Sequence, residues 1–405
     1  MRLALVALVI LSSVATATSA DSLNCRRLGN YDSPVGFATD VQVGDTIACA
    51  AWADGGLRIV GIADPRHPYE LGYFTPSITT IGVALQDSLA YIADHRDGVY
   101  VVNLADPRNP REVAHYPTPW IATRLVVRDT LLYIACRSGG LHILRIADPG
   151  RPTEIGYCEG LGIANDVAVA GNYAYLCTSL DNYLWVVSIA DPAHPQVAGR
   201  CPLAQDGDAV AVAGGYAYVA GGDIYVIDVS DPANPTEVDA YVTRGDARGV
   251  TVSGDSAYVG DGSFGLRVLD VSDPANPQEC AYYNTPGSAG ASVVIGNRVY
   301  VADDVAGLQI IELFAAGSGM AHGKPGAGHA APGPSVVRGV LRLTGDRRPV
   351  TEDRAVLLDA SGRRVLELQA GINDVSRLAP GVYFVHEQLR LDQHAQATRA
   401  VVLIR

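Results

Sequence analysis

Short stretches of apolar and alternating residues recur along most of this chain, and most of them end in the same polar turn. Two examples are GVYVVNLAD at 98–106 and GLHILRIAD at 140–148. Valine, isoleucine and tyrosine favour the pleated surface of a β-strand. No segment keeps a 3.6-residue period over a helical length. The pattern therefore predicts an all-β protein with few helices.

An Asp-Pro pair closes six of these stretches, at intervals of 40 to 43 residues. A second proline follows three residues after the first in every copy. Aspartate can accept backbone N–H bonds and proline presets φ for a turn, so each pair predicts the exit turn of a strand. The pairs are Asp64-Pro65, Asp106-Pro107, Asp148-Pro149, Asp191-Pro192, Asp231-Pro232 and Asp273-Pro274.

Each repeat holds four strand candidates, as in 70–74, 82–86, 89–93 and 98–105. Turn sequences such as Gln86-Asp87-Ser88 separate them. A seventh copy, GLQIIELF at 307–314, lacks the Asp-Pro pair. Four short antiparallel strands in about 42 residues are typical of a propeller blade. The sequence thus predicts a seven-bladed β-propeller over residues 26–314.

Residues 26–31 indicate how the ring closes. Their sequence RRLGNY is similar to YELGYF at 69–74, the strand that follows an Asp-Pro turn, but no such turn precedes it. The seventh copy has no such strand after it. We therefore expect residues 26–31 to supply the outer strand of the last blade, which leaves no open edge there.

The stretches YVIDVSD at 225–231 and LRVLDVSD at 266–273 resemble the LVIVD-repeat family. The resemblance covers about residues 26–314. It implies an exported bacterial propeller, and it supports the fold more than any one activity.

Residues 1–20 are predicted to be a secretory signal peptide. They carry Arg2, an apolar run over 3–11 and then small residues, which places cleavage after Ala17 or Ala20. The run is too short to span a membrane comfortably, and no later stretch is long enough, so no transmembrane span is expected.

The C-terminal part differs in composition from the repeats. Glycine, alanine and proline dominate 315–335, which predicts a linker. Short strand candidates in 336–405 predict a small Ig-like β-sandwich. This part also resembles the C-terminal sorting domain of type IX secretion, which implies contact with the secretion machinery and delivery to the outer cell surface or the medium. The matching positions are Asp359, Ser361, Gly362, Arg363, Gly371, Asn373 and residues 378–385.

Charge and cysteine content further limit the expected partners and the expected state of the thiols. The formal net charge is −13, and Lys324 is the only lysine, so nucleic acid is not an expected partner. The chain has seven cysteines, an odd number, so at least one is unpaired or pairs between chains. Most of them lie in strand-like runs, which indicates buried thiols.

No nucleophile elbow, zinc helix or phosphate loop is present in the sequence, so no enzyme activity is predicted. His67 and His194 occupy the same slot of two Asp-Pro turns, which favours a role in the turn. Of the tryptophans, Trp52 and Trp120 could stack on a ligand, whereas Trp185 lies in an apolar strand and is predicted to be core.

The repeats differ most where the innermost strand of each blade begins and where its second strand ends, at one mouth of the central axis. A carboxylate ring there could hold Ca²⁺ or hydrogen-bond a sugar. The interspersed arginines favour ion pairing within the mouth instead. The candidate ligand-binding residues are Asp40, Asp94, His95, Arg124, Asp166, Asp208, Arg248, Asp261 and Asp303, with Arg96, Asp97 and Asp304 beside them.

Three functions remain open at this point. The first is an exported module that binds a protein or a glycan. The second is a propeller enzyme of lyase, lactonase or glycosidase type, with its site at the mouth. The third is a structural component of a surface layer.

Overall fold

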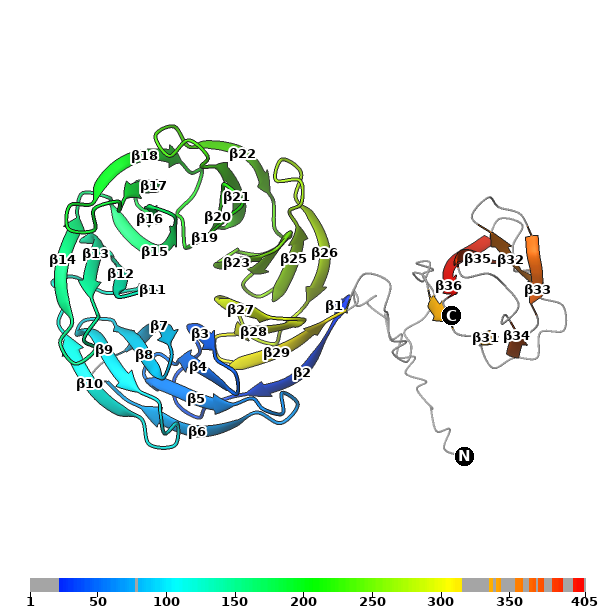
Figure 1. Ribbon diagram of the computed structural model, residues 1–405, viewed down its shortest axis with the longest axis horizontal. Helices are drawn as coiled ribbons and strands as arrows, with labels where there is room; N and C mark the ends of the chain where they lie inside the picture. Colours follow the sequence, from blue (N-terminus) through cyan, green and yellow to red (C-terminus); the bar gives the residue numbers. More distant parts are fainter. Residues whose placement is uncertain are drawn as a thin grey trace, which may run out of the picture.

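The computed structural model describes residues 22–76 and 79–314 with their side chains, and the backbone of seven short strands between Ser335 and Leu403. In the first part, seven antiparallel sheets stand around a common axis (Figure 1). The predicted seven-bladed β-propeller is confirmed. The described residues include no helix that could span a membrane.

Blades 1 to 6 each run from an innermost to an outermost strand in chain order. Blade 1 consists of β3 (Asp40–Val43), β4 (Ile47–Ala51), β5 (Leu57–Gly61) and β6 (Tyr69–Phe74). Blade 2 consists of β7 (Thr80–Gln86), β8 (Leu89–Asp94), β9 (Gly98–Asn103) and β10 (Arg111–Tyr116). Blade 3 consists of β11 (Arg124–Arg128), β12 (Leu131–Cys136), β13 (Gly140–Arg145) and β14 (Thr153–Cys158).

The next three blades repeat this order. Blade 4 consists of β15 (Ile163–Ala170), β16 (Tyr173–Ser179), β17 (Tyr183–Ser188) and β18 (Gln196–Pro202). Blade 5 consists of β19 (Ala209–Ala213), β20 (Tyr216–Gly221), β21 (Asp223–Asp228) and β22 (Thr236–Tyr241). Blade 6 consists of β23 (Gly249–Ser253), β24 (Ser256–Gly260), β25 (Leu266–Asp270) and β26 (Gln278–Tyr283).

Blade 7 joins the two ends of the propeller. It contains β27 (Ser292–Ile295), β28 (Arg298–Ala302) and β29 (Leu308–Leu313), and β2 (Cys25–Tyr31) is its outermost strand. The register runs from Cys25 opposite Leu313 to Tyr31 opposite Leu308. The predicted ring closure is confirmed. A short preceding strand, β1 (Ser22–Leu23), pairs with β26 as a fifth strand of blade 6, which the sequence did not predict.

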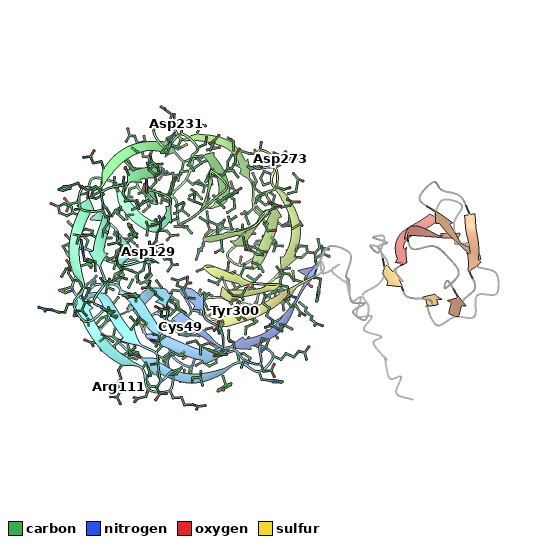
Figure 2. All side chains as sticks on the ribbon, viewed as in Figure 1. Cys49, Arg111, Asp129, Asp231, Asp273 and Tyr300 are labelled. Atoms are coloured by element: carbon green, nitrogen blue, oxygen red, sulfur yellow. The ribbon has the colours of Figure 1, made fainter. Side chains whose placement is uncertain are left out.

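The core lies between blades. Each apolar cluster takes side chains from two neighbouring sheets, as where Val99 and Val101 of blade 2 meet Leu132 and Ile134 of blade 3. A single blade buries little without its neighbours, so stability depends on the closed ring. The seven cysteines are all free thiols, five buried and two half-buried. Cys49, for example, lies within the sheets (Figure 2).

The Asp-Pro turns have the predicted role. In all six, the aspartate Oδ1 accepts the backbone N–H two residues later, at 3.0–3.2 Å. Asp231 and Asp273 show the place of these turns at the periphery (Figure 2). The imidazole Nδ1 of His67 and of His194 lies 2.8 Å from the carboxylate of its own turn, which confirms their turn role.

These turns also fit against the neighbouring blade. A Cβ added at Gly72 of β6 would lie 2.5 Å from the carbonyl oxygen of Pro107 in the next blade. Gly29 of β2 meets the Pro65 carbonyl of blade 1 in the same way. A glycine lets the two backbones approach this closely. This contact explains the glycine shared by RRLGNY and YELGYF.

The backbone described in the C-terminal part consists of strands. One sheet has the order β30-β36-β35-β32-β33, and β31 pairs with β34. How the sheets pack lies outside the described residues, as do the predicted signal peptide and nearly all of the predicted linker. The strands are β30 (Ser335–Val337), β31 (Val340–Leu343), β32 (Arg354–Asp359), β33 (Arg364–Leu368), β34 (Gly371–Asp374), β35 (Gly381–Gln388) and β36 (Gln396–Leu403).

Candidate functional site

The two faces of the propeller are made by different loops. The first and third strands of each blade begin on one face, which we call the mouth face. The Asp-Pro turns lie on the opposite face, which we call the turn face. On the mouth face, isolated backbone bridges join neighbouring blades, such as Ala53 to Thr80 and Ala38 to Asp304. These bridges hold the loops of adjacent blades together.

Asp40 and Asp166 cap the innermost strands at the mouth. The two carboxylate oxygens of Asp40 accept the backbone N–H groups of Val41 and Val83, at 2.9 and 3.0 Å. Asp166 does the same with Val167 and Val210, at 2.8 and 2.9 Å. An innermost strand has no sheet partner on its axial side, so its N–H groups need such acceptors. Each carboxylate thereby ties its own blade to the next.

Arg124 supplies the complementary donors. Its guanidinium donates to the carbonyl of Ile81 at 2.6 Å and to that of Thr39 at 3.2 Å, and lies 3.6 Å from the Asp40 carboxylate. One side chain of blade 3 therefore contacts blades 1 and 2. This half of the mouth contains the ion pairing that the interspersed arginines suggested.

The other half of the mouth is more acidic and more open. Asp208 and Arg248 each precede an innermost strand by one residue, and both are exposed. Arg248 donates to Asp246 at 2.9 Å. Partial desolvation and the nearby Asp246 carboxylate raise the pKa of Asp208 to about 6. Asp208 thus faces solvent in the mouth beside further carboxylates.

The aspartates at the ends of the second strands are buried. Asp94, Asp261 and Asp303 are fully inaccessible to solvent. Asp303 accepts the Thr285 hydroxyl at 2.5 Å and the Gly287 N–H at 3.0 Å. These carboxylates lie under the mouth-face loops rather than on the surface.

His95 lies half-buried beside these loops. Partial burial and the charges of Arg96 and Arg137 lower the pKa of its imidazole. The neutral ring is therefore the favoured form near pH 7.

The mouth-face carboxylates of the described part do not form a cluster that would by itself bind Ca²⁺. No three histidine, cysteine, aspartate or glutamate side chains converge there closely enough to hold a metal ion. Asp40 and Asp166, two of the acidic residues that looked like a ring in the sequence, instead bind backbone N–H groups of separate blades.

Exposed apolar side chains gather on the mouth face, a feature that the sequence reasoning missed. Seven large ones lie in its loops, whereas the other eight of the described part lie in strands, seven of them in strands at the outer edge of a blade. Trp185 is buried, as predicted, and Trp120 is 46% exposed, so its ring is accessible to a ligand, whereas Trp52 is buried and cannot stack on one. The seven are Val35, Phe37, Trp120, Leu180, Val242, Phe264 and Val305.

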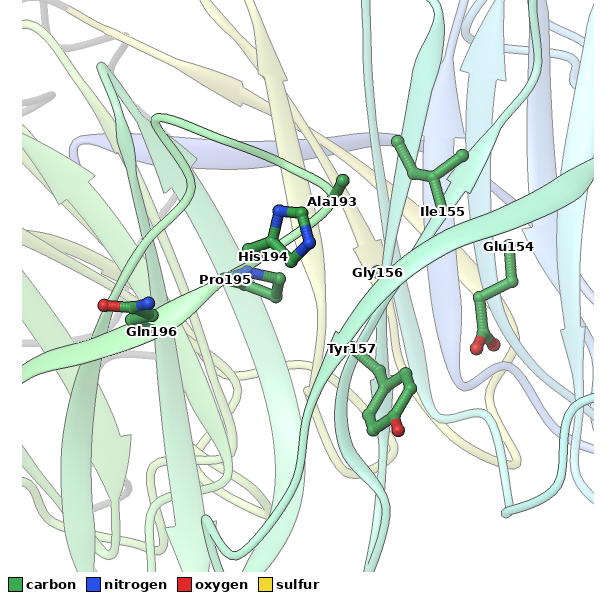
Figure 3. A pocket seen from close by; sticks show the side chains of 8 residues that line it. All are labelled: Glu154, Ile155, Gly156, Tyr157, Ala193, His194, Pro195 and Gln196. Carbon is green, nitrogen blue, oxygen red and sulfur yellow. The ribbon is translucent and has the colours of Figure 1, made fainter.

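A groove of about 570 Å³ lies elsewhere, on the outer wall between blades 3 and 4 (Figure 3). Its two sides are β14 and the turn before β18. Glu154 at one edge already accepts the Tyr116 hydroxyl at 3.2 Å and lies 3.0 Å from His142. No predicted site residue lines the groove. The lining residues are Glu154, Ile155, Gly156, Tyr157, Ala193, His194, Pro195 and Gln196.

The buried carboxylates predict how stability changes with pH. Burial raises the pKa of both Asp166 and Asp303 to about 6, above the value of about 3.9 in an unfolded chain. The folded state then binds more protons than the unfolded state between about pH 4 and 6. The free energy of unfolding should therefore rise by about 1 kcal/mol per group as pH falls from 7 to 5.

Urea denaturation at pH 5 and pH 7 measures this effect. Asp303→Asn should reduce the pH dependence, since the titrating group is gone. Asp129→Asn, in an exposed turn, is the matched control and should leave it unchanged. An equal slope in Asp303→Asn and wild type would contradict the assignment.

The fold and the mouth define the class of the protein: a seven-bladed β-propeller with charged residues from several blades at one end of its axis. Within that class, the chain belongs to the LVIVD repeat family. The family pattern matches residues 35–75, 79–118, 121–159, 161–202, 205–243, 244–285 and 286–313. The last match is the shortest because β2, from the start of the chain, supplies the outer strand of that blade.

Solved structures support the same fold. The WD40 β-propeller domain of Doa1 is 12% identical, with a TM-score of 0.58 over 71% of this chain and 96% of that one. The computationally designed protein Ika8 is also 12% identical, with a TM-score of 0.54 over 68% and 83%. At this identity the likeness concerns the fold alone. No curated protein sequence matches the chain.

Proposed function

We propose that this protein is an exported binding module that contacts a protein partner through its mouth face. One observation carries the proposal: the exposed apolar side chains of the loops lie almost entirely on that face. Apolar side chains that gather on one face of a soluble protein are typical of an interaction surface. LVIVD repeats and a rigid propeller suit such a module.

The charges of the mouth face add a preference for the partner. Asp206, Asp208 and Asp246 lie at the open half of the mouth, where Arg248 is paired with Asp246. A partner surface that combines apolar and basic side chains complements this arrangement. The export part of the proposal rests on residues 1–20 and on the resemblance of 336–405 to a sorting domain.

The state of the carboxylates favours binding over catalysis. Both oxygens of Asp40 and of Asp166 accept backbone N–H groups, and Asp303 is buried in the same kind of bonds. A lyase, lactonase or glycosidase would need carboxylates that converge on a substrate. A surface-layer role would place a second copy of this chain on the mouth face.

Site-specific photo-crosslinking in cells that produce the protein tests the proposal. A benzophenone side chain at position 242 or 264, on the mouth face, should give a discrete adduct with one protein. Position 197, an exposed valine of the outer wall, is the matched control and should give none. Purified wild type should compete for the adduct, and Val242→Ser/Phe264→Ser should compete about tenfold less well.

Three results would overturn the proposal. The first is the same adducts from positions 197 and 242. The second is an adduct only with another copy of this chain. The third is glycan binding that Trp120→Ala removes, with no protein adduct.

A further inference from the structure

Two cysteines, Cys25 and Cys280, belong to the apolar cluster where the ring closes. The chain runs along the outer edge of blade 6 as β1, turns at Asn24 with φ 55°, and enters blade 7 as β2. The Asn24 side-chain amide donates to the Cys280 carbonyl at 2.9 Å. The next residue, Cys25, directs its thiol to the Tyr282 carbonyl, also at 2.9 Å. Both contacts hold the start of β2 against the segment 280–282.

Both sulfur atoms belong to one apolar cluster between blades 6 and 7. Cys25 is buried there with Leu266 and Ile311, and Cys280 packs against the same cluster from β26. Cys280 lies in a β-bulge of β26, with its sulfur 3.4 Å from the Val268 carbonyl. Neither thiol has a covalent partner in this structure.

The other five cysteines offer no comparable pair. Cys49, Cys136 and Cys158 lie in three different clusters. Cys177 and Cys201 share a cluster, but both are paired with Leu184, from opposite sides of its strand. Two strand spacings separate their backbones by about 9–10 Å. That separation exceeds the Cα distance of up to about 7 Å that a disulfide allows.

We propose that Cys25 and Cys280 form a disulfide when the protein matures in an oxidising environment, and that this bond fastens the closing strand of the propeller to blade 6. Each thiol loses its proton, and the pair loses two electrons to an external disulfide such as oxidised glutathione. That disulfide is reduced to two thiols. The bond requires the Cys25 sulfur to leave the carbonyls of Leu23 and Tyr282 for the sulfur of Cys280.

The surroundings also indicate when the bond forms. Burial raises the pKa of the Cys25 thiol to about 12, and it raises that of Cys280 as well. Little reactive thiolate is therefore present once β2 has docked. We expect the bond to form during folding, before the strand is buried, and to be slow to form or to reduce in the native protein.

The test is refolding of the mature full-length chain in a mixture of reduced and oxidised glutathione. Proteolysis without reductant, followed by mass spectrometry, should give one cross-linked peptide containing Cys25 and Cys280. Titration of the unfolded protein should find about five free thiols instead of seven. The oxidised protein should melt about 5–10 °C above the reduced one.

Matched variants make the outcome specific. Cys25→Ser/Cys280→Ser should abolish the difference in melting temperature, and Cys158→Ser, another half-buried cysteine, should keep it. A cross-link to any other cysteine, or seven free thiols after oxidative refolding, would overturn the inference. This experiment does not depend on the binding partner or on export, so its failure leaves the proposed function untouched.

Discussion

Deletion of residues 22–31 is expected to lower the free energy of unfolding by about 5 kcal/mol or more, because it removes the strand that closes the ring. This strand, β2, pairs with β29 over its whole length. Its Leu28 and Tyr31 side chains pack against the cluster that contains Trp52 and Ile310. The Tyr31 hydroxyl also donates to Glu70 of blade 1. Without β2, blade 7 has three strands and an unpaired edge.

The matched control is deletion of residues 22–23 alone. This removes β1, which pairs with β26 at two positions, and should cost about 1 kcal/mol. Urea denaturation measures both losses, and light scattering should show association of the longer deletion through its open edge. If the two deletion variants had equal free energies of unfolding, β2 would not be the strand that stabilises the closed ring.

The closure of the ring by residues 26–31 could be predicted because short local sequence patterns indicate it. The Asp-Pro pairs set the blade length, and RRLGNY supplies the strand that the last repeat lacks. β1 could not be predicted, because two residues carry no periodicity. Its pairing depends on the turn at Asn24 and on the bond from Asn24 to Cys280.

The mouth could be predicted only in part. Asp40, Arg124 and Asp166 lie at one end of the axis, as their residue types and their positions in the repeats predicted. Their partners are backbone groups of other blades, some 40 to 85 residues away, such as Thr39 for Arg124. A strand pattern does not show which backbone groups lack a sheet partner. Apolar residues in loops, such as Val242 and Val305, looked in sequence like any other core residue.

A second network between blades recurs, and the sequence analysis did not detect it. A tyrosine of one outer strand donates to a glutamate of the next outer strand, which faces a cation or histidine on its own blade. The network joins blade 7 to blade 1, blade 2 to blade 3, and blade 5 to blade 6, through Tyr31–Glu70–Arg58, Tyr116–Glu154–His142 and Tyr241–Glu279–Arg267. The members lie far apart in the chain, so only the packed ring brings them together.

Replacement of Arg267 by Met is expected to cost about 3–5 kcal/mol of stability, because it leaves a buried carboxylate without its cation. Arg267 is 1% exposed, and its Nε lies 3.5 Å from the fully buried carboxylate of Asp261. Its guanidinium also donates to the Phe264 carbonyl at 2.8 Å and to Asn284 at 2.9 Å. Arg58→Met should cost less, since its partner Glu70 is 31% exposed in the side chain and keeps the Tyr31 hydroxyl.

A double-mutant cycle separates the lost ion pair from the lost packing. If the unpaired charge dominates, Asp261→Asn in the Arg267→Met background should restore about 1–3 kcal/mol, because the fully buried carboxylate that lost its cation is then replaced by a neutral amide. If packing dominates, the two losses should add. Urea denaturation of the four proteins gives the coupling energy. Because Arg267 donates to the carbonyl of Phe264 in a mouth-face loop, the same variant should weaken the proposed photo-crosslinking from position 264 more than from position 242.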